Sequence, residues 1–344
     1  MKFAWIVNNY GSLKDTIGGY SRRVCETLER KENTQVRIHQ GYTAEASGIQ
    51  KILSFQMTSA IMRATRQVLK EHVDVVVIEY PFIEWNPCIL IATYFLRLAA
   101  HLHNTTVVLS LHEFNRMGKL RKIVSKALMR NSDIVFVTDQ TNFDLVKKVN
   151  SNCFLRSIPS PMTVVWNDGE MKEYNREFIY FGLINSSKAF KEMLSAFSRF
   201  NADGKKKLRV YSSTPVIEAL PRGVEFYYER SDEELQRALK DATYCILPIK
   251  PEVTLGSASL KAATQAGCTL IGSFSDDVKD QRFVINVTSY RTESFAEGFE
   301  RAYNLPLDRL IKNSASGYRY SLDFSFEKTA VEMLKAIEKT RNEE

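Results

Sequence analysis

The stretch FIYFGLINSSKAFKEMLSAF, residues 178–197, decides the fold of this sequence. It opens with four apolar residues, continues through a polar loop that begins at Gly182, and ends in apolar residues at helical spacing. A short run that is apolar on both faces is typical of a strand in a parallel sheet that helices cover. The stretch therefore predicts one strand–loop–helix unit of an α/β protein.

Similar strand patterns recur along the chain in two sets of four, with helical patterns between them. The predicted strands are residues 3–7, Val73–Glu79, Val107–Leu111 and Ile134–Thr138, and then Phe178–Phe181, Leu208–Tyr211, Thr243–Leu247 and Thr269–Ile271. Between the sets lies Pro159–Asn175, a polar segment with prolines at its start, which is typical of an interdomain linker. We therefore expect two Rossmann-like lobes that face one another across a cleft, with ligands at the carboxyl ends of the strands.

The chain length of 344 residues supports two domains, because single hydrophobic cores stop growing at roughly 250–300 residues. The expected parts are an N-terminal domain over residues 1–160, a C-terminal domain over 161–322 and a final segment over 323–344. Residues 323–338 have an apolar pattern at helical spacing, with Phe324 and Phe326 at its start. We expect this last helix to pack against a large surface.

The composition is that of a soluble globular enzyme, with 44% hydrophobic and 25% charged residues. The most apolar stretch, Cys88–Leu96, ends at Arg97, far short of the roughly 20 residues that a membrane-spanning helix needs. The first apolar run is too short for a secretory signal. The 5 cysteines form no C-x-x-C pair, which argues against a disulfide framework and against a zinc site. We expect a cytoplasmic protein without a metal.

The net charge of +7 comes from the first part of the chain, where residues 1–160 carry 21 Lys and Arg against 13 Asp and Glu. Six of these basic residues lie between Glu113 and Asp133, with no acid among them: Arg116, Lys119, Arg121, Lys122, Lys126 and Arg130. Apolar residues recur there at helical spacing and predict a core-facing stripe of Leu120, Ile123, Val124, Ala127 and Leu128. The basic face of this helix is either simply solvated or docks on anionic lipid headgroups.

Two further positions follow predicted strands of the first lobe. Gly18 and Gly19 precede a helical pattern, so they form either a backbone site for a phosphate or only a tight turn. The glycine-rich fingerprint of nicotinamide binding is missing after the first strand. His112 ends the third predicted strand, where it either faces a substrate or caps the next helix.

The stretch 178–197 resembles the retaining, family-4-type glycosyltransferases of the two-lobed GT-B fold. In that family the strand is followed by Gly-Arg-Leu, three variable residues and Lys-Gly, and here Gly182 and Lys188 stand at the matching spacing. Leu183 replaces the Arg and Ala189 replaces the second Gly. The resemblance implies that Lys188 holds the diphosphate of a sugar donor and neutralises the charge that grows on it.

A second stretch, ILPIKPEVTLGSASLKAATQAGCTLI over residues 246–271, resembles the donor loop and helix of the same family. The resemblance implies a phosphate cradle made by Gly256, Ser257 and Ser259. The family's two glutamates, counted back from Gly267, fall on Thr254 and Ala262, so both carboxylates are replaced, and Glu252 is the nearest substitute for the first. Lys261 either reaches the same diphosphate or is a solvent-facing helix lysine.

The resemblance implies a hexosyltransferase-type enzyme that uses no metal, takes a UDP-sugar and retains the anomeric configuration. His112 would lie beside the sugar, Lys188 at the diphosphate, and the last helix would cross back to the first lobe. The basic lobe would bind a glycan or lipid-linked acceptor of polysaccharide synthesis at the inner face of the cell membrane. The alternative is a catalytically silent GT-B subunit that binds another glycosyltransferase. Nucleic-acid binding has only the charge in its favour.

Overall fold

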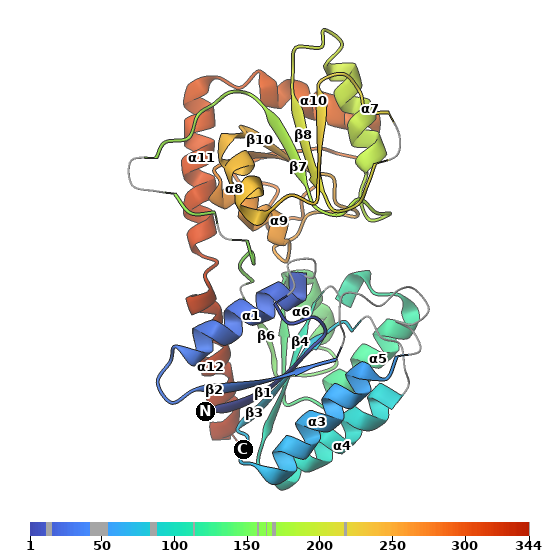
Figure 1. The fold of residues 1–344 in the computed structure, drawn as a ribbon, viewed down its shortest axis with the longest axis vertical. Coiled ribbons are helices and arrows are strands. Elements are labelled where there is room, and N and C mark those ends of the chain that lie inside the picture. The colour runs from blue at the N-terminus through green and yellow to red at the C-terminus, as the bar shows by residue number, and fades with distance from the viewer. Residues whose placement is uncertain are drawn as a thin grey trace. The chain divides into compact units, whose positions relative to one another are not determined.

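The computed structural model describes the chain except for residues 12–15, 42–53, 83–87, 113, 157, 163, 167–169, 217–218 and 344. The described residues form two compact units (Figure 1). Unit 1 comprises Met1–Pro161 together with Ser325–Glu344, and unit 2 comprises Met162–Phe324. Each unit is an α/β domain with a parallel sheet of its own.

Unit 1 is built on a six-stranded parallel sheet with the order β2-β1-β3-β4-β5-β6. Its strands are β1 (Lys2–Val7), β2 (Gln35–Gln40), β3 (Val75–Tyr80), β4 (Thr106–Leu111), β5 (Ile134–Val137) and β6 (Cys153–Leu155). Its helices are α1 (Thr16–Glu29), α3 (Gln56–Lys70), α4 (Cys88–Leu102), the 3-10 helix η1 (Phe114–Arg116), α5 (Lys119–Arg130), α6 (Gln140–Val146) and α12 (Phe326–Glu343).

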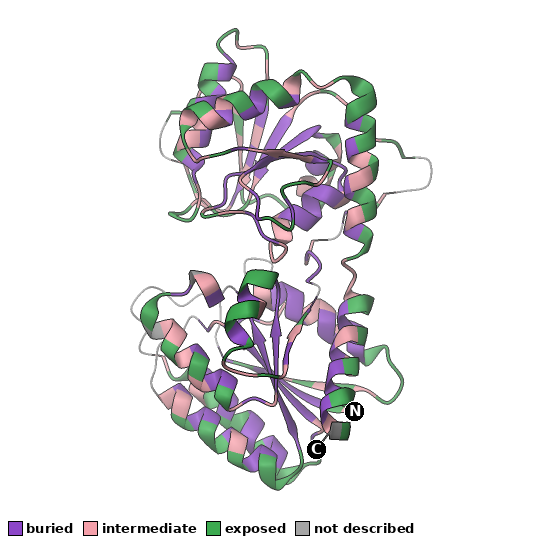
Figure 2. Cartoon of the chain, turned by 180° about the vertical axis from the view of Figure 1, so that it is seen from behind, coloured by how far each residue is buried: buried purple, intermediate pink, exposed green. Residues whose placement is uncertain are grey.

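Helices cover both faces of this sheet, and the central strands β3, β4 and β5 are therefore buried along their whole length (Figure 2). Successive residues of a strand point to opposite faces. Phe3 and Trp5 pack with α1 and α12, whereas Ala4 and Ile6 pack with α3, α4 and α5. Strands that are apolar on both faces thus have a separate core on each side.

Unit 2 has a second six-stranded parallel sheet, with the order β12-β11-β10-β7-β8-β9. Its strands are β7 (Phe178–Phe181), β8 (Leu208–Ser212), β9 (Val224–Tyr228), β10 (Tyr244–Leu247), β11 (Thr269–Gly272) and β12 (Val284–Asn286). Its helices are α7 (Phe190–Phe200), α8 (Asp232–Asp241), α9 (Ala258–Gln265), α10 (Thr292–Tyr303) and α11 (Leu307–Leu322). Helices α7 and α10 share one core with the sheet, and α8 and α9 share the other.

The strand orders fix where a ligand is expected in each unit. Counted from β7, the sheet of unit 2 runs 3-2-1-4-5-6, the order of a Rossmann fold, and it reverses direction between β7 and β10. The sheet of unit 1 reverses between β1 and β3. Open α/β sheets bind ligands beyond the carboxyl ends of the strands at such a point. Ligands are therefore expected at the loops after β7 and β10 in unit 2 and at the loops after β1 and β3 in unit 1.

The predicted α/β class with two Rossmann-like units is confirmed, and all eight predicted strands are present. The prediction missed β2, β6, β9 and β12, which are the edge strands of the two sheets. In these strands most residues are partly or fully exposed, whereas the central strands are buried. The pattern of apolar residues on both faces therefore predicts central strands but not edge strands.

The predicted linker Pro159–Asn175 is wrong over much of its length, because its described later part is bonded into unit 2. Nε1 of Trp166 donates to the carbonyl oxygen of Gln265 at 2.9 Å. Nζ of Lys172 donates to the carbonyl oxygens of Ala242 at 2.7 Å and Ala266 at 2.8 Å, which are the C-cap residues of α8 and α9. One ammonium group thus caps the negative ends of two helices.

The last helix joins unit 1, as the resemblance implied. It begins at Phe326, not at residue 323, and Phe324 lies in unit 2. Ala330, Met333 and Ile337 of this helix are buried in the core that α1 shares with the sheet, and the ring of Phe326 lies 6.1 Å from that of Tyr20. The expected packing of its aromatic start is confirmed for Phe326.

Candidate active site

The loops after β7 and β10 of unit 2 are bonded to each other at the point where the strand order reverses. The N–H of Ala189 donates to the carbonyl oxygen of Pro248 at 2.8 Å, and the N–H of Lys250 donates to that of Ser187 at 2.8 Å. Lys188 and Ile249 form an antiparallel bridge between these bonds. The two stretches that carry the family resemblance are therefore neighbours at the carboxyl end of the sheet.

Gly182 and Lys188 bound the first of these loops. Gly182 has a φ of +122°, a conformation that residues with a Cβ rarely adopt, and none of the described atoms beyond its chain neighbours lies within 4 Å of where its Cβ would be. Its absent side chain is therefore a requirement of the backbone and leaves the approach to the loop open. Lys188 follows in the same loop with a half-buried side chain, directly before the residue that caps α7.

Thr254 organises the second loop, before α9. Its hydroxyl oxygen accepts from the N–H of Gly256 at 3.3 Å, and its carbonyl oxygen accepts from that of Ser257 at 2.9 Å. Oγ of Ser257 then accepts from the N–H of Leu260 at 3.3 Å and caps the helix. Some groups of the predicted phosphate cradle are thus already hydrogen-bonded within the loop and the first turn of the helix. The cradle retains the Ser257 hydroxyl proton and the first-turn N–H groups from Ala258 and Ser259, which have no partner in the helix ladder.

The other residues predicted around the donor lie in the same loop and helix. Glu252 is half-buried, two residues before Thr254. Ala262 is buried in α9, so no carboxylate occupies that position. The reading of Lys261 as a solvent-facing lysine is wrong, because its side chain is only 1% exposed and its Nζ lies 4.6 Å from the ring centre of Phe324. A contact from Lys261 to a diphosphate stays a prediction.

In unit 1 the glycine pair lies inside α1, not in a loop before it, because the helix begins at Thr16. Both glycines are buried. A Cβ on Gly18 would lie 1.7 Å from the carbonyl oxygen of Asn9, so this glycine lets the helix pack directly on the end of β1. Gly18 thus has a packing role that neither of the two predicted readings included. Gly19 lies next to it in the first turn of α1.

His112 lies at the carboxyl end of β4, as predicted; its side chain is buried, and among the described residues it contacts Glu79 and Ser110 and caps no helix. Its Nε2 lies 2.8 Å from Oε2 of Glu79 and 3.2 Å from Oγ of Ser110. Glu79 and Ser110 are register partners on β3 and β4. Burial alone would raise the pKa of the Glu79 carboxyl, but hydrogen bonding by His112 and the charge of Arg156 outweigh it and hold this pKa below its usual range.

Arg156 completes a buried polar cluster with Glu79, Ser110, His112 and Tyr20. Its Nη2 donates to Oγ of Ser110, and its guanidinium carbon lies 5.2 Å from the ring centre of Tyr20. Within the described part of the chain, Oε1 of Glu79, Nε and Nη1 of Arg156 and the hydroxyl of Tyr20 are buried without a hydrogen-bond partner. Such atoms are rare inside proteins, which makes this cluster a candidate for a functional role. The cluster lies beside β1 and β3, where the sheet of unit 1 reverses direction.

The sequence analysis missed Glu79 and Arg156, although the signal for Glu79 was present. Val75 and Val77 point into the core below α1 and α12, and Glu79 continues their row with a charged side chain. A carboxylate in an otherwise apolar, central strand needs a partner. Arg156 gives no such signal, because it follows the short edge strand β6, which the prediction did not include.

The predicted basic helix is α5, and it presents Lys119, Lys126 and Arg130 as exposed residues, with Arg121 and Lys122 half-buried. Arg116 lies in η1, and its side chain is outside what the structure describes. The prediction of Ile123 as a core residue is wrong, and the side chain of Leu120 lies outside what the structure describes. Ile123 is 61% exposed, so it lies in the basic face and not in the core, whereas Leu128 is buried.

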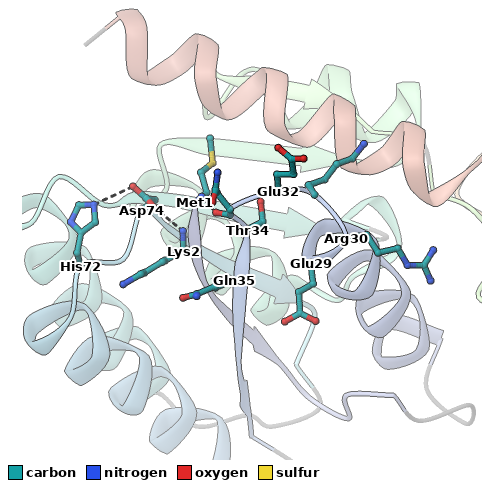
Figure 3. Close-up of a pocket in the computed structure, with 11 residues that line it drawn as sticks. Met1, Lys2, Glu29, Arg30, Glu32, Thr34, Gln35, His72 and Asp74 are labelled. Carbon is teal, nitrogen blue, oxygen red and sulfur yellow. Dashed lines mark hydrogen bonds and ion pairs between the residues drawn. The ribbon is translucent and has the colours of Figure 1, made fainter.

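A cavity of about 560 Å³ lies elsewhere on unit 1, at the amino ends of β1 and β2 (Figure 3). Lys2 and Asp74 line it, and the backbone N–H of Lys2 donates to Oδ2 of Asp74 at 2.8 Å. His72 lies 3.3 Å from the same carboxylate. Parallel sheets bind their ligands at the opposite, carboxyl edge. This cavity is therefore not the site that the loops predict.

Comparison with known proteins gives a fold. No protein-family model matches the chain, and no curated protein matches its sequence. Among solved structures, the N-terminal domain of a trehalose-6-phosphate phosphatase from Candida albicans has a TM-score of 0.71 at 10% identity, over 98% of this chain and 97% of that one. A glycosyltransferase from Rickettsia africae has a TM-score of 0.70 at 11% identity, over 98% of each chain. HepE of Anabaena, solved with UDP, has a TM-score of 0.68 at 8% identity, over 98% and 100%.

The chain has the GT-B fold. These identities are too low to carry an activity from one chain to another. The GT-B fold fixes two Rossmann-like units and a last helix that returns to the first of them. In the described part of the chain, none of the helices combines the length and the apolarity that crossing a membrane would require.

Proposed function

We propose that this chain is a glycosyltransferase that transfers a sugar from a nucleotide donor, with a UDP-sugar as the first candidate. The donor site is proposed on unit 2, at the loops after β7 and β10. The HepE structure, which shares the fold, was solved with UDP, and this supports the choice of nucleotide. The proposal extends to hexosyl transfer with retention and without a metal, as the sequence resemblance implies.

The observation that carries the proposal is the pairing of the two loops at the reversal point of the sheet. Residues far apart in the sequence, at 187–189 and 248–250, are held together by backbone hydrogen bonds. This pairing brings Lys188 and the start of α9 to the same edge of one sheet. A lysine together with a helix N-terminus is a suitable site for a diphosphate, since both favour negative charge.

The proposed chemistry is stabilisation of the leaving diphosphate. Lys188 would neutralise the charge that develops as the glycosidic bond breaks, and the Ser257 hydroxyl and the Ser259 N–H would donate to phosphate oxygens. Glu252 and Lys261 are proposed as further donor contacts. His112 is proposed to contact the transferred sugar, with its ring held in one orientation by Glu79.

The proposed acceptor is a glycan or lipid-linked precursor of a surface polysaccharide, bound by the basic unit 1. An anionic acceptor would match the charge of α5. We also propose that the protein is cytoplasmic and associates peripherally with the inner face of the cell membrane.

The test is a thermal-shift panel with UDP-, GDP-, dTDP- and ADP-sugars and the free diphosphates. A ligand at 100 times its Kd stabilises the fold by about 2.7 kcal/mol, which gives a measurable rise in Tm. We expect one nucleotide to raise the Tm and Lys188→Ala to abolish most of that rise. Lys191→Ala is the matched control, since it removes the same charge from an exposed position of α7. An equal loss in both variants, or no shift with any nucleotide, would refute the donor site.

A silent GT-B subunit is the second candidate, and one observation favours it. Thr254 and Ala262 occupy the positions of the family's two carboxylates, and both side chains are buried. The two functions separate in a transfer assay. A silent subunit would neither hydrolyse the sugar nucleotide nor transfer its sugar, even where a nucleotide raises the Tm. Its binding to a partner enzyme would survive Lys188→Ala.

A further inference from the structure

Helix α4 of unit 1 is apolar on two faces, although only one of them packs against the protein's own core. Ala92, Leu96 and Ala100 are among its buried residues. The opposite face carries five large apolar residues that are between 48% and 69% exposed: Ile91, Tyr94, Phe95, Leu98 and Leu102. Apart from the adjacent pair Tyr94 and Phe95, neighbouring members are three or four residues apart, which places them on one side of the helix. This set of residues is called here the α4 stripe.

The helices beside α4 extend this apolar surface. Helix α3 packs along α4, and α5 contacts α4 from the same side of the sheet (Figure 1). Helix α3 exposes Met62 and Leu69, and α5 exposes Ile123. Large exposed apolar patches, rimmed by polar residues, mark protein or membrane interaction sites. The surface of α3, α4 and α5 is called here the α3–α5 face.

The charge of the α3–α5 face is entirely positive. The sequences of α3, α4 and α5 contain no Asp or Glu, and they contain nine Lys and Arg: Arg63, Arg66, Lys70, Arg97, Lys119, Arg121, Lys122, Lys126 and Arg130. Arg97 is paired, at 2.5 Å, with Asp133 outside these helices. By contrast, α11 in unit 2 also exposes Leu307, Ile311 and Leu322 but carries Asp308 among them.

We infer that the α3–α5 face docks on an anionic lipid bilayer, with the α4 stripe inserted among the headgroups. A bilayer with anionic lipid is complementary to this face, because its apolar interior accommodates the exposed apolar side chains and its negative surface attracts the basic ones. The 15 residues of α4 span about 22 Å, which suits a helix that lies in the plane of the interface. The row of Lys119, Ile123, Lys126 and Arg130 on α5 places one apolar residue among basic ones, a combination that suits the same interface.

This docking is independent of the donor site. Under the proposed function it has one consequence, which rests on that function: the acceptor is a molecule carried in the bilayer. The basic helix α5 alone would give an attraction that salt abolishes. The α4 stripe adds an apolar contribution, so part of the binding should persist at high salt.

The experiment is flotation of the full chain with phosphatidylcholine vesicles, made with and without phosphatidylglycerol. The stripe variant carries Tyr94→Ser, Phe95→Ser and Leu98→Ser. We expect it to lower the partition coefficient on anionic vesicles by at least about a hundredfold, because three large apolar side chains are lost from the interface. The matched control, Leu307→Ser with Ile311→Ser and Leu322→Ser on α11, should leave flotation unchanged. Lys126→Glu with Arg130→Glu should lower it by at least about tenfold at low salt.

Two results would overturn the inference. One is equal flotation of the stripe variant and the unaltered chain. The other is a dimer in sedimentation velocity, without flotation, that the stripe variant converts to a monomer, because a second copy would then cover the stripe. The Tm of each variant without nucleotide reports whether it folds. The nucleotide-dependent rise in Tm, measured separately, distinguishes a failure of docking from a failure of the proposed donor site.

Discussion

The carboxyl ends of the two sheets differ in the groups that they present: mainly backbone groups in unit 2 and buried charged side chains in unit 1. In unit 2 this end is mainly backbone: paired loops, a glycine with positive φ and a helix N-terminus, with Lys188 as a half-buried cation. In unit 1 it holds a buried ionic cluster, in which Glu79 and Arg156 are at most 2% exposed. Backbone sites depend on loop geometry, whereas buried charges depend on each other. Substitutions should therefore affect stability more in unit 1 and ligand binding more in unit 2.

The largest effect is expected from Glu79→Ala. Removing this carboxylate leaves Arg156 and His112 buried with Ser110 but without their anionic partner, which costs about 3–5 kcal/mol of unfolding free energy. Denaturant unfolding measures the change. The matched control is Glu293→Ala, which breaks the exposed pair of Glu293 with Arg199 at 3.4 Å and should cost at most about 1 kcal/mol. Equal losses in both variants would mean that the cluster of unit 1 is not ionic.

A smaller effect is expected from Gly182→Ala in unit 2. A Cβ at a φ of +122° strains the backbone by about 1–3 kcal/mol, although it meets no other atom. The loop should shift, and the nucleotide-dependent rise in Tm should fall more than the unfolding free energy does. Gly118→Ala is the control, because that glycine has an ordinary φ of −64° and a Cβ there would meet none of the described atoms within 4 Å, and its effect should stay below about 1 kcal/mol. A loop that tolerates Gly182→Ala without loss of binding would remove Gly182 from the site.

The smallest effect is a pH dependence that Glu79 contributes. Its pKa is lowered in the folded protein, so the unfolded chain binds more protons as the pH falls below the usual glutamate pKa of about 4.3. The stabilisation from this carboxylate is therefore complete at neutral pH and is lost as the pH falls through the lowered pKa. The difference in unfolding free energy between the unaltered chain and Glu79→Gln should shrink on acidification. A constant difference would show that Glu79 does not titrate in this range.

The sequence predicted the centre of each sheet and the loops of unit 2, and it did so for physical reasons. Central strands such as β4 and β10 must be apolar on both faces, and this pattern is local. Edge strands such as β9 have no such requirement, so they leave no comparable signal. The loops of unit 2 were found through their resemblance in spacing to a known family, which also anticipated the return of α12.

The ionic cluster of unit 1 could not be predicted in the same way. Glu79 lies on β3 and Arg156 follows β6, and only the register of β3 with β4 and the position after β6 bring their side chains together. The packing of Gly18 against Asn9 and the exposure of Ile123 depend likewise on how a helix is rotated against the sheet. Such rotations follow from tertiary packing and not from the periodicity of a single helix.

The central claim is that the nucleotide binds at the paired loops of unit 2, and hydrogen exchange with and without UDP tests it most directly. Backbone amides that a diphosphate covers should exchange more slowly. We expect UDP to slow exchange at residues 182–189 and 255–260, and we expect Lys188→Ala to remove that protection while Lys191→Ala retains it. Protection confined to other segments, or none at a UDP concentration that raises the Tm, would contradict the proposed site.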